Sequence, residues 1–330
     1  MKLLELNDDC LEAIFRRLPL QTGVRTRAVC RKFKAIIEER ICQGQHSLML
    51  FNSFNNILRY CDFLADFNAP LEDKESEYRY DESKDLVIRG DINEKKVQFL
   101  LGLFPNVKNL VLFYTKFHTT TDLINLVSGW NAQLQSFVFV HPHKSLNLTF
   151  AFHSINLLPL PALKSLTVTG ERRYLLKTTI KMPKIIGRLE ELTVGLYACD
   201  IEPVLKQVGL NLRKLRFHTV KFPLEVLKRF VAQKPYIKTR LTHFSIDADT
   251  IKLGEDEFSM GCPFEFPHKG VSEATFKFIG SNFKALTYLD ITPNSEVILP
   301  FYHSLSVTNY TFFLSDHSSI CTTSFHFCQN

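Results

Sequence analysis

Residue types that could carry chemistry are present in this sequence, but they do not assemble into a catalytic set. His141 and His143 flank a proline and could bind a metal, yet no second group of ligands completes such a site. Cys321, His326 and Cys328 lie close together near the C-terminus, where metal binding is again the less favoured interpretation. No HExxH, GxSxG, GxGxxG or phosphate-loop sequence occurs. We therefore expect a protein that is not an enzyme and that binds no cofactor and no metal.

A basic region in the middle of the chain offers the clearest binding chemistry. Between Lys164 and Arg240 there are 17 Lys and Arg against 6 Asp and Glu, although the whole chain carries a net charge of only +6. Within this region Lys214, Arg216 and His218 alternate along one predicted strand, so their side chains share a face. This pattern predicts a surface for an acidic or phosphorylated segment of a partner. A charged face that is simply solvated is the alternative.

The elements that must position these residues repeat along the chain. An apolar-x-x-apolar-x-apolar unit begins at Val107, Leu134, Leu163, Leu189, Leu212, Leu241 and Leu286. The starts are 27, 29, 26, 23, 29 and 45 residues apart, and the first five spacings lie within or at the edge of the range of leucine-rich repeats, about 20–29. The sixth spacing predicts an insertion near residues 252–269.

Helical spacing of apolar residues fills the gaps between these units, in residues 94–104, 121–130, 202–208, 224–233 and 272–283. One strand and one helix in each unit, always in the same order, predict an α/β fold with parallel strands on a concave side and helices outside. Residues 48–51 and 86–88 could add degenerate strands. The segment from residue 301 onward has a different composition and could be a cap.

Side chains that flank the buried apolar positions are expected to point outward from the concave face. A partner could bind there through Val111, Phe113, Lys214, Arg216, His218, His243, Asp247, Tyr288 and Asp290.

The capping residues and apolar spacing in residues 3–41 predict three short helices. Asp9 can cap the first helix, and Glu12 completes a capping box. Leu11, Ile14, Phe15 and Leu18 then fall on one helical face, and the third helix spans about residues 28–40. Three helices in about 40 residues bury too little apolar surface to be stable alone. This module therefore needs a second surface to pack against.

The run Leu6-Asn-Asp-Asp-Cys-Leu-Glu-Ala-Ile-Phe-Arg-Arg-Leu-Pro-Leu20, followed by Arg27-Ala-Val-Cys-Arg-Lys-Phe-Lys34, resembles an F-box motif. The resemblance implies docking on a Skp-type adaptor, which bridges to cullin and RING subunits. The implied adaptor contacts are Leu6, Leu11, Ile14, Phe15, Leu18, Pro19, Leu20, Val24, Val29, Cys30 and Phe33. The sequence departs from the family pattern at Asn7, where Pro is usual, at Gly23, where a larger apolar residue is common, and at Phe33, which stands for Trp.

The whole chain resembles F-box proteins with leucine-rich repeats. This resemblance implies an F-box in residues 1–44, a linker in 45–92, a repeat arc in 93–300 and an atypical tail in 301–330. It also implies the substrate-recognition subunit of an SCF-type ubiquitin ligase, with the target held by the arc. In that family an Asn usually stands three residues after the last apolar position of each repeat. In this sequence other residues mostly occupy that position, for example Thr115.

Two other functions stay open at this stage. The chain could be a repeat scaffold that binds partners without a ligase, its N-terminal helices serving only as a cap. It could also bind nucleic acid through the basic region 164–240, although no recognised module supports that. The N-terminus becomes acidic before any apolar run, and no stretch of about 18 apolar residues occurs. We expect a cytoplasmic or nuclear protein with no membrane partner.

Overall fold

The computed structural model divides the chain into two compact units, Met1–Leu163 and Lys164–Asn330. The described residues are 3–53, 55–56, 84–141, 155–156, 158–170, 183–195, 198–218, 223–247, 273–291, 310–316 and 323–329. Each unit is considered by itself. None of the described helices is both long and apolar enough to cross a membrane.

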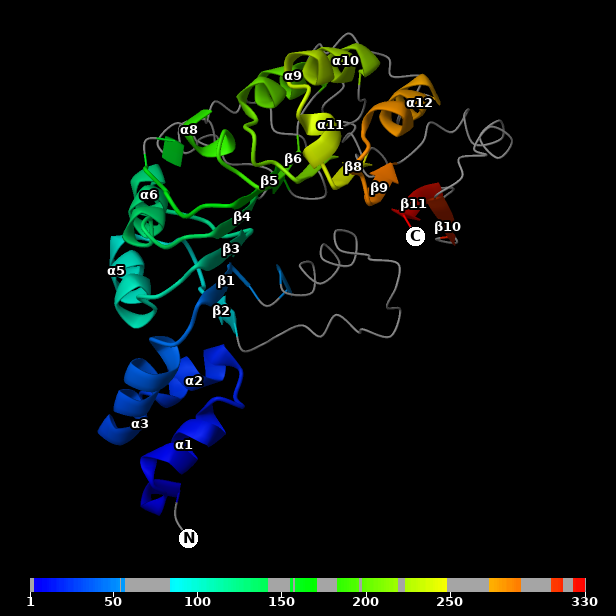
Figure 1. Ribbon diagram of the computed structural model, residues 1–330. Helices are drawn as coiled ribbons and strands as arrows, with labels where there is room; N and C mark the ends of the chain where they lie inside the picture. Colours follow the sequence, from blue (N-terminus) through cyan, green and yellow to red (C-terminus); the bar gives the residue numbers. More distant parts are fainter. Residues whose placement is uncertain are drawn as a thin grey trace. The chain divides into compact units, whose positions relative to one another are not determined.

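The first unit opens with a module of short helices, residues 3–42, here called the N-terminal module (Figure 1). It consists of the 3₁₀-helix η1 (Leu3–Glu5), α1 (Asp8–Phe15), α2 (Leu20–Thr26), α3 (Arg31–Ala35) and the π-helical turn η2 (Ile36–Cys42). The three predicted helices are therefore present, and α3 with η2 takes the place of the third.

The cap of α1 differs from the expectation. Asn7 is the N-cap, and its Oδ1 accepts a hydrogen bond from the Cys10 amide at 2.8 Å. The prediction that Asp9 caps this helix is wrong, because the chain enters the helix two residues earlier. The departure from the family pattern at Asn7 thus supplies the group that satisfies an otherwise unpaired helix amide.

A parallel sheet follows in the same unit. Its strands are β1 (Ser47–Phe51), β2 (Asp85–Val87), β3 (Asn109–Phe113) and β4 (Ser136–His141), in the order β2-β1-β3-β4. Helices α5 (Glu94–Leu103) and α6 (Thr120–Gly129) lie outside the strands. The two degenerate strands that the sequence suggested before the first full repeat are thus part of the sheet.

The second unit contains the remaining strands. They are β5 (Ser165–Gly170), β6 (Glu191–Gly195), β7 (Lys214–His218), β8 (His243–Asp247), β9 (Tyr288–Ile291), β10 (Tyr310–Asp316) and β11 (Thr323–Gln329). Strands β5 to β9 pair in sequence order and in parallel. Strand β11 then pairs antiparallel with β9 and with β10, so the atypical C-terminal segment ends this sheet.

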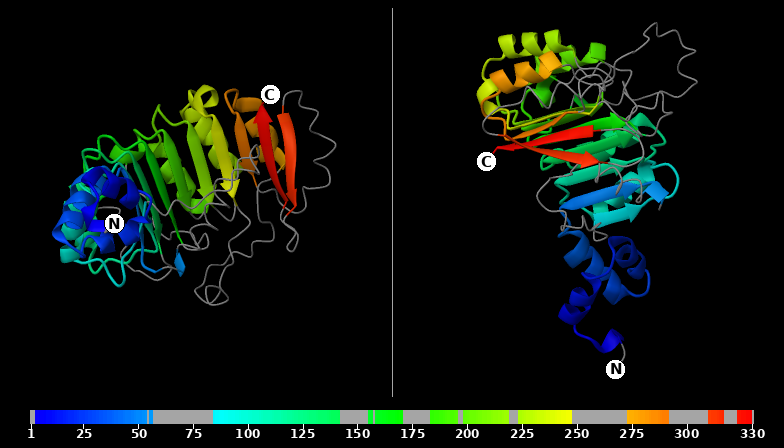
Figure 2. Two further views of the ribbon diagram at one scale, coloured as in Figure 1. Left: turned by 90° about the horizontal axis from the view of Figure 1, so that it is seen from below. Right: turned by 90° about the vertical axis from the view of Figure 1, so that its right-hand side faces the viewer.

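Helices cover one face of the strands of the second unit (Figure 2). They are α8 (Pro183–Ile186), α9 (Ala198–Gln207), α10 (Leu224–Gln233), α11 (Ile237–Arg240) and α12 (Glu273–Asn282). The predicted alternation of strand and helix is confirmed, with parallel strands on one side and helices on the other. The boundaries of α10 coincide with those expected from its apolar spacing.

The repeated apolar positions form the core. The first, fourth and sixth positions of the repeats are at most 7% exposed wherever their side chains are described, as at Leu110 (0%), Leu192 (1%) and Leu289 (7%). Phe137, Phe217, Phe244 and Phe283 are among the largest fully buried side chains. The abundance of Phe in the sequence therefore supplies a layered core that recurs from repeat to repeat.

A hydrogen-bond pattern also recurs at the start of each strand. The Lys164 carbonyl, just before β5, accepts the amides of Glu190 at 2.8 Å and Glu191 at 3.0 Å. The carbonyls of His46, Lys108, Glu190, Arg213 and Thr242 occupy the same position and likewise accept two consecutive amides from a following strand. Residues at equivalent positions of neighbouring repeats are thereby held side by side.

One strand end takes over the role of the missing Asn. Thr115 is 4% exposed, and its hydroxyl donates to the Leu50 carbonyl at 2.8 Å. It thus satisfies a buried carbonyl between neighbouring strands, as a side-chain amide would. The other positions where an Asn was expected, and the predicted insertion at 252–269, lie outside the described residues.

Candidate functional site

The N-terminal module has a small aromatic and aliphatic core. Leu11 is 0% exposed, Phe15 and Phe33 are each 3% exposed, and the two aromatic rings meet edge to face with centroids 4.9 Å apart. Leu20, at the start of α2, is 4% exposed. These four residues were expected to contact an adaptor, and the structure places them inside the module. Their adaptor contact stays a prediction, while their packing gives the module its shape.

Other apolar side chains of the module face solvent. Val29, in the turn between α2 and α3, is 67% exposed, and Ile14 on α1 is 39% exposed. Leu3 and Leu4, on η1, are 48% and 55% exposed. Elsewhere among the described residues, only Phe99 and Leu210 are large apolar side chains that are exposed. In the part of the chain that the structure describes, most of the exposed large apolar side chains thus lie in residues 3–42.

The remaining expected contacts are half-buried: Leu6, Leu18, Pro19, Val24 and Cys30. The Cys30 sulfur has a local role, because it accepts a hydrogen bond from the Phe33 amide at 3.5 Å at the start of α3. Leu18 and Pro19 lie in the connection between α1 and α2, where they remain partly accessible to a partner.

Charged side chains tie α1 to η2. Arg40 Nη1 lies 3.0 Å from Asp9 and 3.1 Å from Glu12, and Arg16 lies 2.7 Å from Glu12. Hydrogen bonds from Arg16 and then Arg40 lower the pKa of the Glu12 carboxyl below its ordinary value. Lys32 donates to the Leu6 carbonyl at 2.7 Å. This exposed network contributes little energy per pair, but it fixes the orientation of the segment that carries the exposed leucines.

The module is attached to the sheet of its own unit. The Arg27 guanidinium lies over the Phe99 ring of α5, 4.6 Å from its centroid, and also pairs with Glu38 at 2.7 Å. Gln21 on α2 accepts a hydrogen bond from the Val87 amide of β2 at 2.8 Å. Beside this contact Asp85 is 4% exposed, and burial raises the pKa of its carboxyl from 3.8 to about 7.

A comparison with known protein families matches residues 3–42 to the F-box domain. The chain contains an F-box domain. F-box domains in general bind Skp-type adaptors in the substrate receptors of SCF-type ligases, which are themselves generally not catalytic. No curated protein matches the chain. The match confirms that residues 6–34 resemble an F-box motif.

The first group of expected target contacts is less accessible than the strand pattern suggested. Val111 is 8% exposed and Phe113 is 1% exposed. Both belong to an apolar cluster with Phe51, Tyr114 and Val140, against which Met49, Val87 and Val138 pack. The expectation that Val111 and Phe113 are exposed is wrong, because apolar side chains of neighbouring strands bury each other on this face. Whether they contact a target stays a prediction.

The side chains of the basic strand β7 are also less exposed than the sequence predicted. Lys214 is exposed and pairs with Glu191 of β6 at 2.7 Å, Arg216 is half-buried, and His218 is 1% exposed. The alternation expected along this strand therefore ends in a buried His218, not in a third exposed charge.

The next two strands carry stacked rings. His243 and Tyr288 lie with centroids 5.5 Å apart and planes inclined by 25°. Burial, followed by the charge of Lys214, lowers the pKa of His243 below its ordinary value, which favours the neutral ring. The side chains of Asp247 and Asp290, also expected to bind a target, lie outside the described part of the structure.

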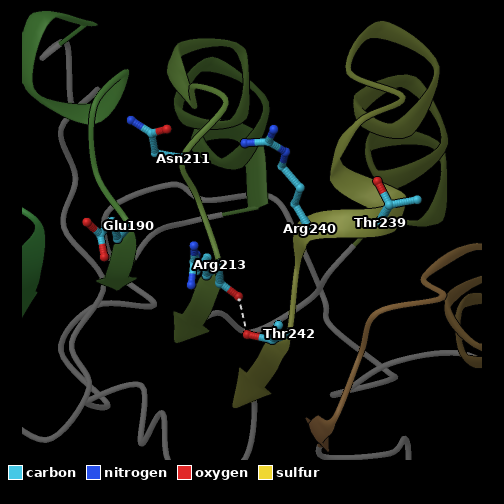
Figure 3. Close-up of a pocket in the computed structure, with 6 residues that line it drawn as sticks. All are labelled: Glu190, Asn211, Arg213, Thr239, Arg240 and Thr242. Atoms are coloured by element: carbon cyan, nitrogen blue, oxygen red, sulfur yellow. Dashed lines mark hydrogen bonds between the residues drawn. The ribbon is translucent and has the colours of Figure 1, made fainter.

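A pocket of about 410 Å³ lies at the edge where the strands of the second unit begin (Figure 3). It is lined by Glu190, Asn211, Arg213, Thr239, Arg240 and Thr242. The Arg240 side chain extends toward Asn211 in this view, and the Thr242 hydroxyl donates to the Arg213 carbonyl at 3.1 Å. None of these six residues was predicted as a site residue.

The sequence held signals for part of what was missed. Leu3 and Leu4 directly precede the quoted motif, and two consecutive apolar residues beside it indicate either burial or a docking surface. Arg213 and Arg240 were counted only as part of the basic region, because 27 residues separate them and only repeat register brings them together. Among the described residues, no group of three or more His, Cys, Asp and Glu is placed to hold a metal ion. Of the metal ligands considered from the sequence, His143 and Cys321 lie outside the described residues, and so do the side chains of His141, His326 and Cys328.

Proposed function

We propose that this chain is the substrate-recognition subunit of an SCF-type ubiquitin ligase. In this proposal the F-box domain docks on a Skp-type adaptor, which links the chain to cullin and RING subunits. The repeated strands and helices, which we propose to be degenerate leucine-rich repeats, hold the target. We place this activity in the cytoplasm or nucleus, since the proposed partners act there.

The exposed apolar side chains of the F-box domain carry the proposal. Leu3, Leu4, Ile14 and Val29 are 39–67% exposed, whereas the neighbouring Leu11 and Phe15 are almost fully buried. Burying a fully exposed side chain of this size contributes about 1.5–3 kcal/mol, and roughly half of that is available here because the side chains are already partly buried. A partner that covers several of them gains enough apolar contact for a stable interface, and a Skp-type adaptor is the partner that this domain type implies.

The attachment of the F-box domain to β2 and α5 supports the same proposal. The Arg27–Phe99 contact and the Gln21–Val87 hydrogen bond hold the domain against the first strands of its unit. A receptor must present its target at a defined place relative to the adaptor, and a domain fixed at two points meets this requirement better than one on a free linker.

The alternative of nucleic-acid binding is less well supported. Within the basic region, acidic side chains pair with Lys164, Lys206, Lys214, Lys228 and Arg229 at 2.7–3.3 Å. These pairs reduce the positive potential that a phosphate backbone requires. A scaffold without a ligase keeps the repeats and lacks adaptor binding, so adaptor binding separates it from the proposal.

Co-expression of the full chain with a Skp-type adaptor and a cullin tests the proposal. Affinity capture of the chain should recover both partners in stoichiometric amounts. Recovery of neither partner, with the chain folded by circular dichroism, would exclude a receptor role and favour the scaffold. If the chain instead captures an oligonucleotide and no adaptor, and this binding weakens steeply as the salt concentration rises, the result would favour nucleic-acid binding.

A further inference from the structure

We propose that the pocket at the strand-start edge of the second unit binds the phosphate group of a phosphoserine or phosphothreonine in the target protein. The proposal rests on the proposed receptor function, and it names what the receptor recognises. It also moves the expected anion contact from the exposed face of β7 to the turns that precede β6, β7 and β8.

Repeat register builds the pocket. Glu190, Arg213 and Thr242 each stand immediately before a strand, at equivalent positions of three consecutive repeats. Their main chains are joined by the recurring bonds in which Glu190 O accepts from Arg213 N at 2.8 Å and Arg213 O accepts from Thr242 N at 2.8 Å. Asn211 and Arg240 stand three residues before β7 and β8. The same register therefore brings their side chains to one edge.

The pocket contains guanidinium donors that the fold does not use. Within the described part of the chain, the Arg213 side chain makes no hydrogen bond and no ion pair, while its carbonyl and amide are fully engaged. Arg240 donates once, to the Leu210 carbonyl at 3.0 Å. Each guanidinium has five N–H groups in a planar fork that matches phosphate oxygens. The pocket thus presents guanidinium N–H groups that remain available to an anion.

The charge of the pocket matches a dianion. Glu190, its acidic member, is paired with Lys164 at 3.3 Å. With this pair neutral, Arg213 and Arg240 leave two positive charges. A phosphate monoester carries about −1.5 to −2 at neutral pH and has three acceptor oxygens, whereas an Asp or Glu side chain supplies one charge and two oxygens. The phosphate therefore satisfies both arginines at once.

Size and surroundings favour a peptide over a nucleic acid. A volume of about 410 Å³ holds one phosphorylated side chain with part of its backbone. Glu190 and Glu191 lie along the same strand-start edge and pair with Lys164 and Lys214, so these two lysines offer little net positive charge to the regularly spaced phosphates of a nucleic acid. Glu190 can instead accept a hydrogen bond from a peptide amide or a basic neighbour of the phosphorylated residue.

The test uses the immobilised full chain and two peptide libraries in equal amounts. One library has a central phosphoserine between degenerate positions, and the other has unmodified serine there. Mass spectrometry of the retained peptides should show at least 10-fold enrichment of the phosphorylated library. Arg213→Gln and Arg240→Gln should each reduce this enrichment about 10-fold, and Arg240→Lys should lie between, because it keeps the charge but loses the fork.

Arg229→Gln is the matched control. Arg229 lies in the same basic region on α10 and pairs with Glu202 at 2.7 Å, outside the pocket. This variant should retain the phosphopeptides as the wild type does. Equal enrichment by the wild type, Arg213→Gln and Arg240→Gln would overturn the proposal, and so would a wild-type chain that does not distinguish the libraries.

Two further measurements separate this proposal from others. Adaptor capture is assayed on the same preparations, and the pocket variants should capture the adaptor as the wild type does. A wild-type chain that captures no adaptor would refute the receptor function, while the peptide result would still stand by itself. A single-stranded oligonucleotide is added as a competitor. Displacement of the phosphopeptides at equal phosphate concentration, itself dependent on Arg213, would assign the pocket to nucleic acid and overturn the peptide proposal.

Discussion

Among the described residues, Asp85 is a carboxyl group in an environment that disfavours its charged form. It opens β2 next to the contact between α2 and β2, is 4% exposed, and neither carboxylate oxygen has a hydrogen-bond partner in the described part of the chain. Burial without a partner disfavours the charged form. The pKa of the carboxyl therefore rises from 3.8 to about 7.

The shifted pKa of Asp85 predicts a stability that falls as pH rises. Between pH about 4 and 7 the unfolded chain loses this proton while the folded chain keeps it, so folding becomes less favourable across that window and the loss is complete above pH 7. We expect Asp85→Asn to be more stable than the wild type at pH 8 by a few kcal/mol, on the order of 1.4 kcal/mol per pKa unit. Urea unfolding between pH 4.5 and 8.5 measures the difference. A difference that does not change with pH would contradict this account.

Residue roles were predictable where they depend on local pattern. The buried positions of the F-box helices follow from apolar spacing, as at Leu11 and Phe15. The cap at Asn7 was missed because Asp8 and Asp9 are equally good cap residues by type, and only the path of the chain selects among the three. The pocket arginines were missed for another reason: their proximity comes from stacking of repeats, which composition does not encode.

Among the elements, two glycines differ in the space available for a side chain. Gly23 lies in α2, where an added Cβ would meet nothing within 4 Å. At Gly209, in the turn before β7, an added Cβ would clash with the Gly187 carbonyl group of the neighbouring repeat. A methyl group therefore has room at Gly23, whereas at Gly209 the backbone of the neighbouring repeat leaves no room for one.

Gly23→Ala should stabilise the F-box domain. Alanine lowers the backbone entropy of the unfolded chain and favours the helix, with a typical gain of about 0.5–1 kcal/mol where no clash arises. Thermal unfolding followed by circular dichroism would register a higher midpoint. A lower midpoint would mean that the space beside Gly23 is not available in solution.

Gly209→Ala should destabilise the second unit. The clash is with backbone atoms of Gly187, which cannot rotate away as a side-chain end can, so the two turns must separate. Overpacking of this kind typically costs about 1–3 kcal/mol. Hydrogen exchange at the amides of β6 and β7 would report faster opening in the variant, and unchanged exchange would argue against close packing of these turns.

Strands and helices were predictable because each repeat must bury three apolar residues, one just before its strand and two within it. Leu189, Leu192 and Val194 show the pattern, and all three are buried. Sequence periodicity does not reveal what covers the opposite face. Phe113 and His218 were therefore expected to be exposed, although neighbouring strands bring further bulky residues beside Phe113 and bury it.

At the scale of the molecule, one end of the chain carries apolar surface that the fold does not cover. The F-box domain buries Leu11, Phe15 and Phe33 for its own stability and leaves Ile14 and Val29 exposed. A module of about 40 residues gains stability from a partner that covers such side chains. The sequence predicted this need for a partner from length alone, and the structure identifies which side chains remain available.

The affinity of the full chain for a purified Skp-type adaptor, measured by isothermal titration calorimetry, tests the central claim most directly. The double variant Ile14→Gln, Val29→Gln should bind about 10-fold or more weakly, since covering the exposed part of each side chain, 39% and 67%, contributes roughly 1 kcal/mol. Leu210→Gln, which alters a side chain 58% exposed outside the F-box domain, is the matched control and should bind as the wild type does. Equal affinity of the double variant and the wild type would contradict docking through this surface.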